Sequence, residues 1–238
     1  MTGQEDPRAL IAIACRVLKA NGHDDYVWGH VSIRDAAGRG TWMKSSGLGF
    51  EEVSADDVIL IDDEGQIVEG DRPRHAEWPI HTEILAANPH LNAVVHTHPP
   101  HAIALAAAGQ PLLPLSHAGT LFTPPEVPRF DLTANLIVDR GLGAALAGVL
   151  GDQRAAFMVN HGIVTAGASL EEAVVRAVLL ENACRQQLLA LQAGTPITAP
   201  DARASLAKRA TVWPPGHLQS LWDYLVRTLP TTEQGASL

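Results

Sequence analysis

The residues with the clearest chemical potential lie in the stretch "NAVVHTHPPHA", residues 92–102, which holds three histidines within six positions. The β-branched run before them predicts a strand, in which alternate side chains point to the same face. His96 and His98 therefore share a side and can hold one ion, whereas Thr97 points the other way. A His-x-His pair alone is weak evidence, because such pairs arise by chance and histidines also form hydrogen bonds at strand ends.

The best third ligand is His161, in the stretch "FMVNHGIVTAG". It follows an apolar strand and precedes Gly162, which would let the backbone turn sharply and present the ring. Imidazole ligands suit zinc, manganese, cobalt or iron. The three histidines predict a divalent metal site. The alternative is that each one only forms hydrogen bonds to the backbone.

Glu77 is the predicted acid or base, at the start of a helix expected over residues 75–89. The dipole of that helix would favour the ionised carboxylate. The neighbours Ala76 and Trp78 indicate an apolar wall, which would instead raise the pKa towards a value useful for proton transfer. His81, one helical turn later, is interpreted as a buried histidine rather than as a partner of the site.

Composition limits the class of protein. The chain has 238 residues, 46% of them hydrophobic and 18% charged, which is typical of a globular protein. A net charge of −9 without a Lys/Arg run argues against a nucleic-acid partner. Cys15 and Cys184 are expected to be buried thiols in a reducing compartment. Since neither a secretory signal nor a membrane-length apolar run is visible, we expect a cytoplasmic protein without a membrane partner.

The elements that must position these residues alternate along the chain. Helices are predicted over residues 8–22, 75–89, 99–109, part of 131–151, 169–194 and around 217–229. Strands are predicted over 26–35 and 40–46, in a hairpin over 57–70, over 91–98, and as two strands within 155–167. Residues 110–130 are proline-rich and are expected to form an irregular functional loop. The pattern predicts one α/β domain over residues 1–238, with residues 195–238 as a C-terminal extension.

Five motifs in this order resemble the class II aldolase/adducin family: "GHVSIR", "KSSGLGFEEVSADDVILID", "AEWPIHTEI", "NAVVHTHPPHA" and "VNHGIVTAG". The resemblance covers roughly residues 8–195. It implies a three-layer α/β/α sandwich around a mixed, largely antiparallel sheet, and a homotetramer with active sites at subunit interfaces. The metal-binding histidines of the family map to His96, His98 and His161. Its catalytic glutamate, which can also touch the metal, maps to Glu77.

The substrate pattern departs from the members of the family that act on sugar phosphates. Those members hold the phosphate with an Asn in a "GN-x-S" stretch, a "TSGI"-like turn and a Ser–Ser pair. Here His30 replaces the Asn and His75-Ala76 replaces the Ser pair, while Ser46 and Gly47 keep the turn. A phosphate dianion needs several fixed donors, so we expect this site to hold it poorly.

The motifs "GHVS" and "AEWPIH", with His117 in the proline-rich loop, are similar to the branch that contains aromatic-acid decarboxylases. These include enzymes for dihydroxyphthalate and for hydroxy-methylpyridine-dicarboxylate. The resemblance implies that His30, His75 and His117 recognise carboxylate or phenol oxygens. Arg74 is a candidate bidentate partner for a carboxylate, or else a surface charge.

We therefore predict a carbon–carbon lyase of aromatic catabolism, a metal-dependent decarboxylase of a hydroxylated aromatic acid such as a dihydroxyphthalate. The cofactor expected is a divalent ion (zinc, manganese, cobalt or iron, with zinc preferred) and no organic group, because no glycine-rich nucleotide or phosphate loop is present. Two alternatives stay open. One is a class II aldolase acting on a sugar phosphate or small hydroxy-ketone, and the other is a metal-free interaction protein.

Overall fold

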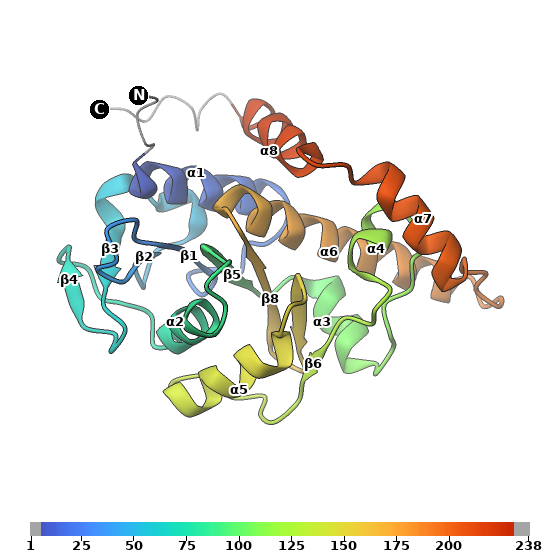
Figure 1. Cartoon of the computed structure of the whole chain (residues 1–238), viewed down its shortest axis with the longest axis horizontal. Coiled ribbons are helices and arrows are strands. Elements are labelled where there is room, and N and C mark those ends of the chain that lie inside the picture. The colour runs from blue at the N-terminus through green and yellow to red at the C-terminus, as the bar shows by residue number, and fades with distance from the viewer. Residues whose placement is uncertain (1–5, 231–238) are drawn as a thin grey trace.

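The computed structural model describes residues 6–230 of the chain (Figure 1). The helices are α1 (Pro7–Ala20), α2 (Trp78–Ala87), α3 (Pro100–Ala107), α4 (His117–Phe122), α5 (Arg140–Leu150), α6 (Leu170–Gln192), α7 (Ala202–Val212) and α8 (His217–Arg227). The strands are β1 (His30–Arg34), β2 (Thr41–Lys44), β3 (Val58–Ile61), β4 (Ile67–Glu69), β5 (Ala93–Thr97), β6 (Arg129–Phe130), β7 (Ala155–Met158) and β8 (Gly162–Gly167). Two short 3₁₀ turns, Phe50–Glu52 and Ala55–Asp57, precede β3.

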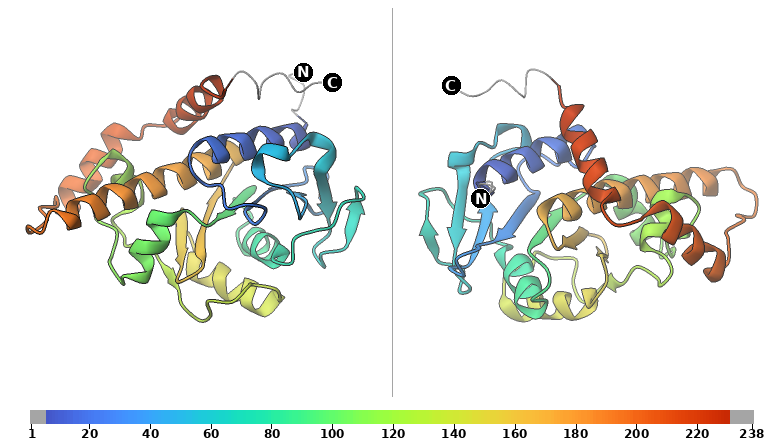
Figure 2. Two further views of the ribbon diagram at one scale, coloured as in Figure 1. Left: turned by 180° about the vertical axis from the view of Figure 1, so that it is seen from behind. Right: turned by 45° about the horizontal axis from the view of Figure 1, so that its top comes forward.

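One mixed sheet forms the middle layer. Its eight strands have the order β4-β3-β2-β1-β5-β8-β7-β6. All neighbouring strands are antiparallel except β6 and β7, which are parallel. Helices α1, α3 and α6 cover one face, and α2 and α5 cover the other (Figure 1, Figure 2). The predicted α/β/α sandwich around a largely antiparallel sheet is confirmed.

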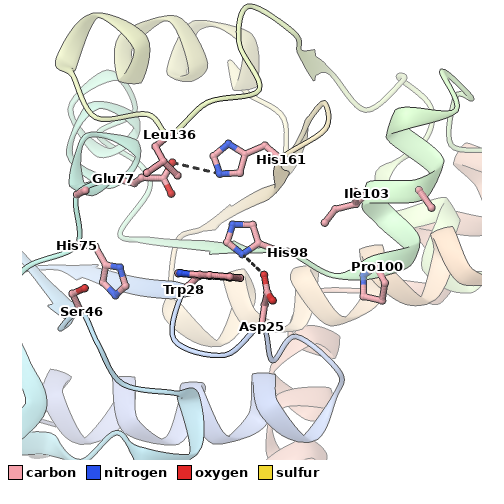
Figure 3. A pocket seen from close by; sticks show the side chains of 12 residues that line it. Asp25, Trp28, Ser46, His75, Glu77, His98, Pro100, Ile103, Leu136 and His161 are labelled. Atoms are coloured by element: carbon pink, nitrogen blue, oxygen red, sulfur yellow. Dashed lines mark ion pairs between the residues drawn. The ribbon is translucent and has the colours of Figure 1, made fainter.

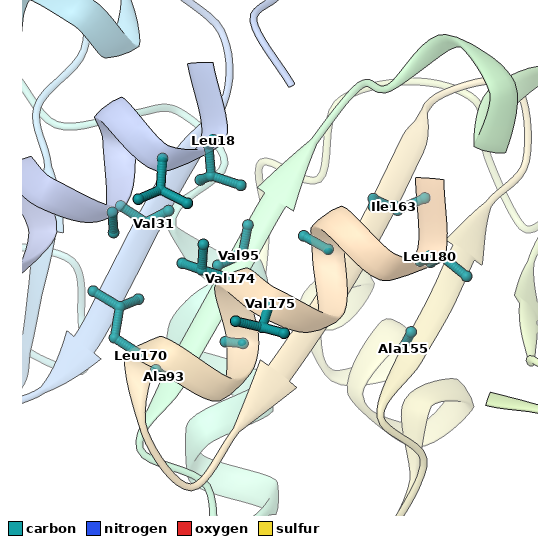
Figure 4. Packing of buried hydrophobic residues seen from close by; sticks show 14 of the residues in the cluster. Leu18, Val31, Ala93, Val95, Ala155, Ile163, Leu170, Val174, Val175 and Leu180 are labelled. Atoms are coloured by element: carbon teal, nitrogen blue, oxygen red, sulfur yellow. The ribbon is translucent and has the colours of Figure 1, made fainter. Parts of the chain in front are cut away.

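Alternate residues of the central strands supply an apolar core on each face of the sheet. On the α6 side the cluster includes Leu18, Val31, Val95, Ile163 and Val174 (Figure 4). On the α2 side the cluster includes Ile80, Ile84, Val94, Leu146 and Val164. Because these side chains are fully buried, truncating any of the leucines or isoleucines to alanine is expected to cost about 2–5 kcal/mol.

The same alternation places the polar residues of the central strands on one face of the sheet or the other. His96 lies opposite His30 in the β1–β5 register and shares the α2 face with Val94, its neighbour two positions earlier. Thr97 points to the other face, where its hydroxyl lies 2.9 Å from Nδ1 of His23. Because of the strand period, His30 of β1 and His96 of β5 lie on the sheet face that α2 covers, and α2 begins directly after Glu77.

Three local predictions differ from the structure. The first strand begins at His30 rather than at residue 26, because Tyr26 has a φ of 50°, which no extended strand can contain. The segment 110–130 is not wholly irregular, since it includes α4 and β6. Helix α7 was not predicted, because its residues are mostly exposed and carry no apolar period.

The C-terminal helices pack on the rest of the chain. Helix α7 contacts α4, and α8 contacts α6 and α1. Within residues 6–230, no helix is both long and apolar enough to cross a bilayer.

Candidate active site and metal centre

Four side chains that the sequence singles out lie together at one end of the central strands. Glu77, His96, His98 and His161 each place one potential ligand atom within 4.8 Å of the others. Glu77 precedes α2 and His161 lies just before β8. His96 is in β5, and His98 follows the last residue of that strand. This group is called the metal cluster below.

Nearby oxygen atoms orient the rings of His96 and His98. Nδ1 of His96 lies 2.9 Å from the carbonyl oxygen of Ile163, so it carries the proton and donates to that oxygen. Nδ1 of His98 lies 3.2 Å from a carboxylate oxygen of Asp25, which is an ion-pair distance without the geometry of a hydrogen bond. The two Nε2 atoms face each other at 3.0 Å, and with the protons on Nδ1 both would offer a lone pair to an ion. Such orientation by a carbonyl or a carboxylate is typical of metal-ligating histidines.

The third histidine is presented by a tight turn between β7 and β8. The turn uses Asn160, whose φ is 59°, and not Gly162 as the sequence suggested. Gly162 serves another purpose, because a Cβ there would lie 2.5 Å from the carbonyl oxygen of Thr97 and 2.8 Å from the ring of His98. The absence of a side chain at residue 162 allows β8 to approach β5 closely enough to bring His161 beside the other ligands.

These residues fit a divalent ion on chemical grounds. Both ring nitrogens of His161 are buried without a hydrogen-bond partner, although Nε2 lies 3.4 Å from Oε1 of Glu77. Burial lowers the pKa of His96 and of His98, which keeps the rings in the neutral form that metals require. Opposed lone pairs and orphaned nitrogens next to a carboxylate are costly without a cation. The donor set suits the imidazole-binding metals predicted from the sequence.

Glu77 is buried and ionised. Burial by itself raises the pKa of Glu77, but the contacts with His161 and His96 and a hydrogen bond from the backbone N–H of Ile137 lower it to about 2. That N–H lies 2.8 Å from Oε1. The expectation that apolar neighbours would raise this pKa is therefore wrong, because the hydrogen-bonding groups around the carboxylate outweigh its desolvation.

A chain of buried polar groups leads from Glu77 into the space between α2 and the sheet. Nε2 of His30 lies 3.9 Å from Oε2 of Glu77, and Nδ1 of His30 lies 2.6 Å from Nε2 of His81. Nδ1 of His81 in turn lies 2.6 Å from the hydroxyl of Ser32. His81 is buried as predicted, but it supports the site by holding the ring of His30.

A cavity of about 730 Å³ opens beside the metal cluster (Figure 3). Glu77, His98 and His161 form part of its polar wall. Its apolar wall consists of Trp28, Pro100, Ile103, Ala104 and Leu136. Ser46 and His75 lie on the opposite side from Pro100 and Ile103 (Figure 3).

The other predicted substrate residues divide into two groups. Ser46 and His75 line the cavity, His30 lies behind it against Glu77, and Gly47 follows Ser46 with a φ of 87°. Two further residues are not brought to the cavity within this chain. The guanidinium of Arg74 lies over the ring of Trp78. His117 is exposed, and its carbonyl accepts a hydrogen bond from Trp213.

Three residues near the site were not singled out from the sequence. Asp25 and Trp28 come from the loop before β1 and line the cavity. Lys44 is fully buried behind His75, with its ammonium 3.4 Å from Nε2 of that ring. Their positions depend on contacts between segments that are distant in the chain. The local sequence near them offers only the glycine after Trp28 and the "KSSG" motif that begins at Lys44 as signs of a functional site. His101, the third histidine of the opening stretch, turns away to Glu181, with 2.5 Å between them.

Known proteins are similar to this chain in sequence and in fold. The sequence profile described as Class II Aldolase and Adducin N-terminal domain matches residues 9–188. The chain belongs to the class II aldolase and adducin family. It is 34% identical over 200 residues, 79% of each chain, to a 3,4-dihydroxyphthalate decarboxylase of Arthrobacter keyseri.

Other relatives extend this picture. The chain is 32% identical over 187 residues to a 5-methylthioribulose-1-phosphate/5-deoxyribulose-1-phosphate aldolase of Rhodospirillum rubrum, covering 79% of this chain and 82% of the relative. An aldolase II superfamily protein from Pseudomonas syringae superimposes with a TM-score of 0.84 at 28% identity, over 96% and 94% of the two chains. The predicted family and its class of reaction, carbon–carbon lyase, are confirmed.

Proposed function

We propose that this protein is a metal-dependent decarboxylase of a hydroxylated aromatic carboxylic acid, such as a dihydroxyphthalate. The observation that carries the proposal is the pairing of the metal cluster with an apolar wall that includes Trp28, Ile103 and Leu136. An aromatic ring can lie against such a wall, whereas a sugar phosphate would leave hydroxyls without partners there. The similarity to dihydroxyphthalate decarboxylases supports the same choice.

The metal cluster would supply the electron sink. A divalent ion held by His96, His98 and His161 would act as a Lewis acid for an oxygen beside the breaking bond. Zinc is preferred among zinc, manganese, cobalt and iron, because three histidines and an open position are typical of catalytic zinc sites.

Glu77 would move the proton. Since its pKa is about 2, the carboxylate begins the cycle as a base and takes the proton of the substrate hydroxyl. Glu77 then gives that proton to the ring carbon that carries the carboxylate, which turns the phenolate into a ketone and removes the aromaticity of the ring. When the bond between this carbon and the carboxylate breaks, carbon dioxide leaves and the electron pair restores the aromatic ring and the phenolate, which regains a proton from solvent. Each step conserves charge, and Glu77 ends ionised.

Hydrogen-bond donors on the side of the cavity that holds Ser46 and His75 would bind the remaining oxygens of the substrate. His75 and Ser46 line the cavity, and the buried ammonium of Lys44 beside His75 adds positive charge to that side. His30, kept in place by His81, faces Glu77 from within the sheet. These groups suit a carboxylate or phenol oxygen.

Product analysis tests the reaction. Metal-loaded protein is expected to release carbon dioxide from dihydroxyphthalate-type acids and no aldehyde from 5-deoxyribulose 1-phosphate. The opposite result would favour the aldolase, for which the Ser46–Gly47 turn at the cavity is the supporting observation. A protein that takes up less than about half an equivalent of ion per chain would favour the metal-free interaction protein.

The proton-transfer role has its own test. Glu77→Gln is expected to retain bound metal, because three histidines hold it, and to lose at least about 100-fold in kcat. Glu64→Gln, in the exposed turn between β3 and β4, is the matched control and should keep full activity. Near-normal turnover in Glu77→Gln would remove Glu77 from proton transfer.

A further inference from the structure

A second cavity, of about 280 Å³, lies where the C-terminal helices meet the rest of the molecule. It shares no lining residue with the active-site cavity. Three arginines line it: Arg154 precedes β7, Arg176 lies on α6, and Arg209 lies on α7. The single acidic residue in its lining is Glu172. The cavity therefore carries an excess of positive charge in a chain whose net charge is −9.

The three guanidinium groups differ in how many of their N–H groups already donate hydrogen bonds within the protein. Arg176 donates to the carbonyl of Ala166 and pairs with Glu172 at 2.9 Å. Arg209 uses Nε and one Nη for the carbonyls of Thr120 and Pro124, which leaves its other Nη free.

Of the three arginines, Arg154 has the most N–H donors without a partner among the described residues. Among residues 6–230, no hydrogen bond or ion pair involves its side chain. Its charge helps to lower the pKa of Arg176 and of Arg209, second to desolvation in the case of Arg209. Arg154 thus lies near both other guanidiniums, and nothing in the described chain neutralises it. Three guanidinium groups that share one carboxylate, Glu172, keep an excess of positive charge, and an anion between them would relieve the repulsion.

The backbone adds further donors. Helix α8 begins after Gly216 without a side-chain cap, and Gly216, Leu218 and Gln219 line the same cavity. The first N–H groups of a helix have no partner within the helix, and they favour negative charge. The N–H of His217 donates to the carbonyl of Pro214, so guanidinium groups and the next N–H groups of α8, those of Leu218 and Gln219, are the donors of the cavity lining.

We propose that this cavity is a binding site for a small phosphate-type dianion. A tetrahedral oxyanion can accept hydrogen bonds from several directions at once, which matches donors from Arg154, Arg209 and the start of α8. A planar carboxylate would be satisfied by a single guanidinium. Because Arg154 belongs to the family domain and Arg209 to the C-terminal extension, the bound anion would join the two parts.

Calorimetric titration of metal-loaded protein with inorganic phosphate, at constant ionic strength, tests this site. Wild-type protein is expected to bind phosphate saturably, and Arg154→Gln to bind at least about tenfold more weakly. Phosphate bound at the metal cluster would affect both proteins equally, so the difference between them isolates the arginine cavity. Arg203→Gln is the matched control, because Arg203 is an exposed arginine on the same helix as Arg209.

Three outcomes would overturn the proposal. Equal affinity of wild-type and Arg154→Gln for phosphate would remove Arg154 from any anion site. Equal weakening by Arg154→Gln and Arg203→Gln would mean an adventitious ion only, attracted by general charge. Dissociation of the oligomer by Arg154→Gln, with no phosphate binding to wild type, would assign the cavity to a carboxylate of a second copy. Should Arg154→Gln not fold, Arg154→Lys, which keeps the charge but not the forked donor, is expected to show reduced affinity.

Discussion

At the scale of single residues, the chemistry depends on which nitrogen of each histidine is free. Nε2 of His96 and Nε2 of His98 face each other, while each Nδ1 is turned towards an oxygen. This orientation is set by Ile163 and by Asp25, neither of which would touch the ion. Asp25 supports the metal cluster without binding the ion, because loss of its carboxylate would free the ring of His98 to rotate.

Asp25→Asn is therefore expected to weaken metal affinity by about 10-fold to 100-fold. The readout is the ion retained against a competing chelator, measured on purified protein. Asp24→Asn is the control, since Asp24 pairs with Lys19 at the surface. Equal affinity of the two variants would show that Asp25 does not orient His98.

The buried histidines also couple stability to pH, and His23 is the simplest case. Burial lowers the pKa of His23 to about 4, below the value of about 6.5 in an unfolded chain. The unfolded state therefore binds more protons below pH 6.5. Stability from this group is complete above pH 6.5 and is lost as the pH falls towards 4.

His23→Gln should accordingly flatten the fall in unfolding free energy between pH 6 and 4.5 by about 1 kcal/mol per pH unit. Urea denaturation at several pH values measures the slope. His90→Gln is the control, because His90 is exposed. The idea fails if both variants keep the wild-type slope.

At the scale of elements, the site depends on how closely β5 and β8 approach. These antiparallel neighbours pair Thr97 with Ile163, and Gly162 lies against the carbonyl of Thr97 and the rings of His96 and His98. The turn through Asn160 then returns His161 to the same end of the sheet. The distance between the two strands thus decides whether the three histidines can share one ion.

Gly162→Ala is expected to destabilise the protein by about 1–3 kcal/mol through overpacking and to reduce metal retention. Gly148→Ala, in α5, has open space around the new Cβ and should be neutral or stabilising by up to about 1 kcal/mol. Thermal unfolding and metal analysis of both variants measure the difference. Unchanged stability and metal content in Gly162→Ala would contradict the close-approach argument.

At the scale of the whole molecule, two apolar side chains of the active-site cavity and two that are close to them in the chain are exposed. Trp28 and Leu136 line the cavity and are 56% and 54% exposed, and nearby in the chain Tyr26 and Leu132 are 81% and 67% exposed. These four residues are called the apolar rim, and the ring centroids of Tyr26 and Trp28 lie 5.6 Å apart. Exposed groups of this kind often mark a protein interface. The rim supports the proposed homotetramer with active sites at subunit interfaces.

Sedimentation analysis is expected to give a mass of about four chains of 25.3 kDa each. Leu132→Glu, in the apolar rim, should lower that mass, because a charge buried in an interface is costly. Leu189→Glu, on the exposed side of α6, is the control and should leave it unchanged. A monomeric wild-type protein would rule out a tetramer, and with it interfacial active sites.

The sequence alone determined the family and the layered fold, and it singled out the four residues that lie together in the structure as the metal cluster. Period-two alternation put His96 and His98 on one face. The strand and the glycine around His161, and the helix start at Glu77, singled out the other two residues, and the family motifs map to the same four positions. These features are local, or are carried by recognisable motifs. Only the tertiary structure decided the ionised state of Glu77, the partners Asp25 and His81, and the separation of His117 from the cavity. Each of these depends on contacts between segments distant in the chain, and strand and helix periodicity carries no record of such contacts.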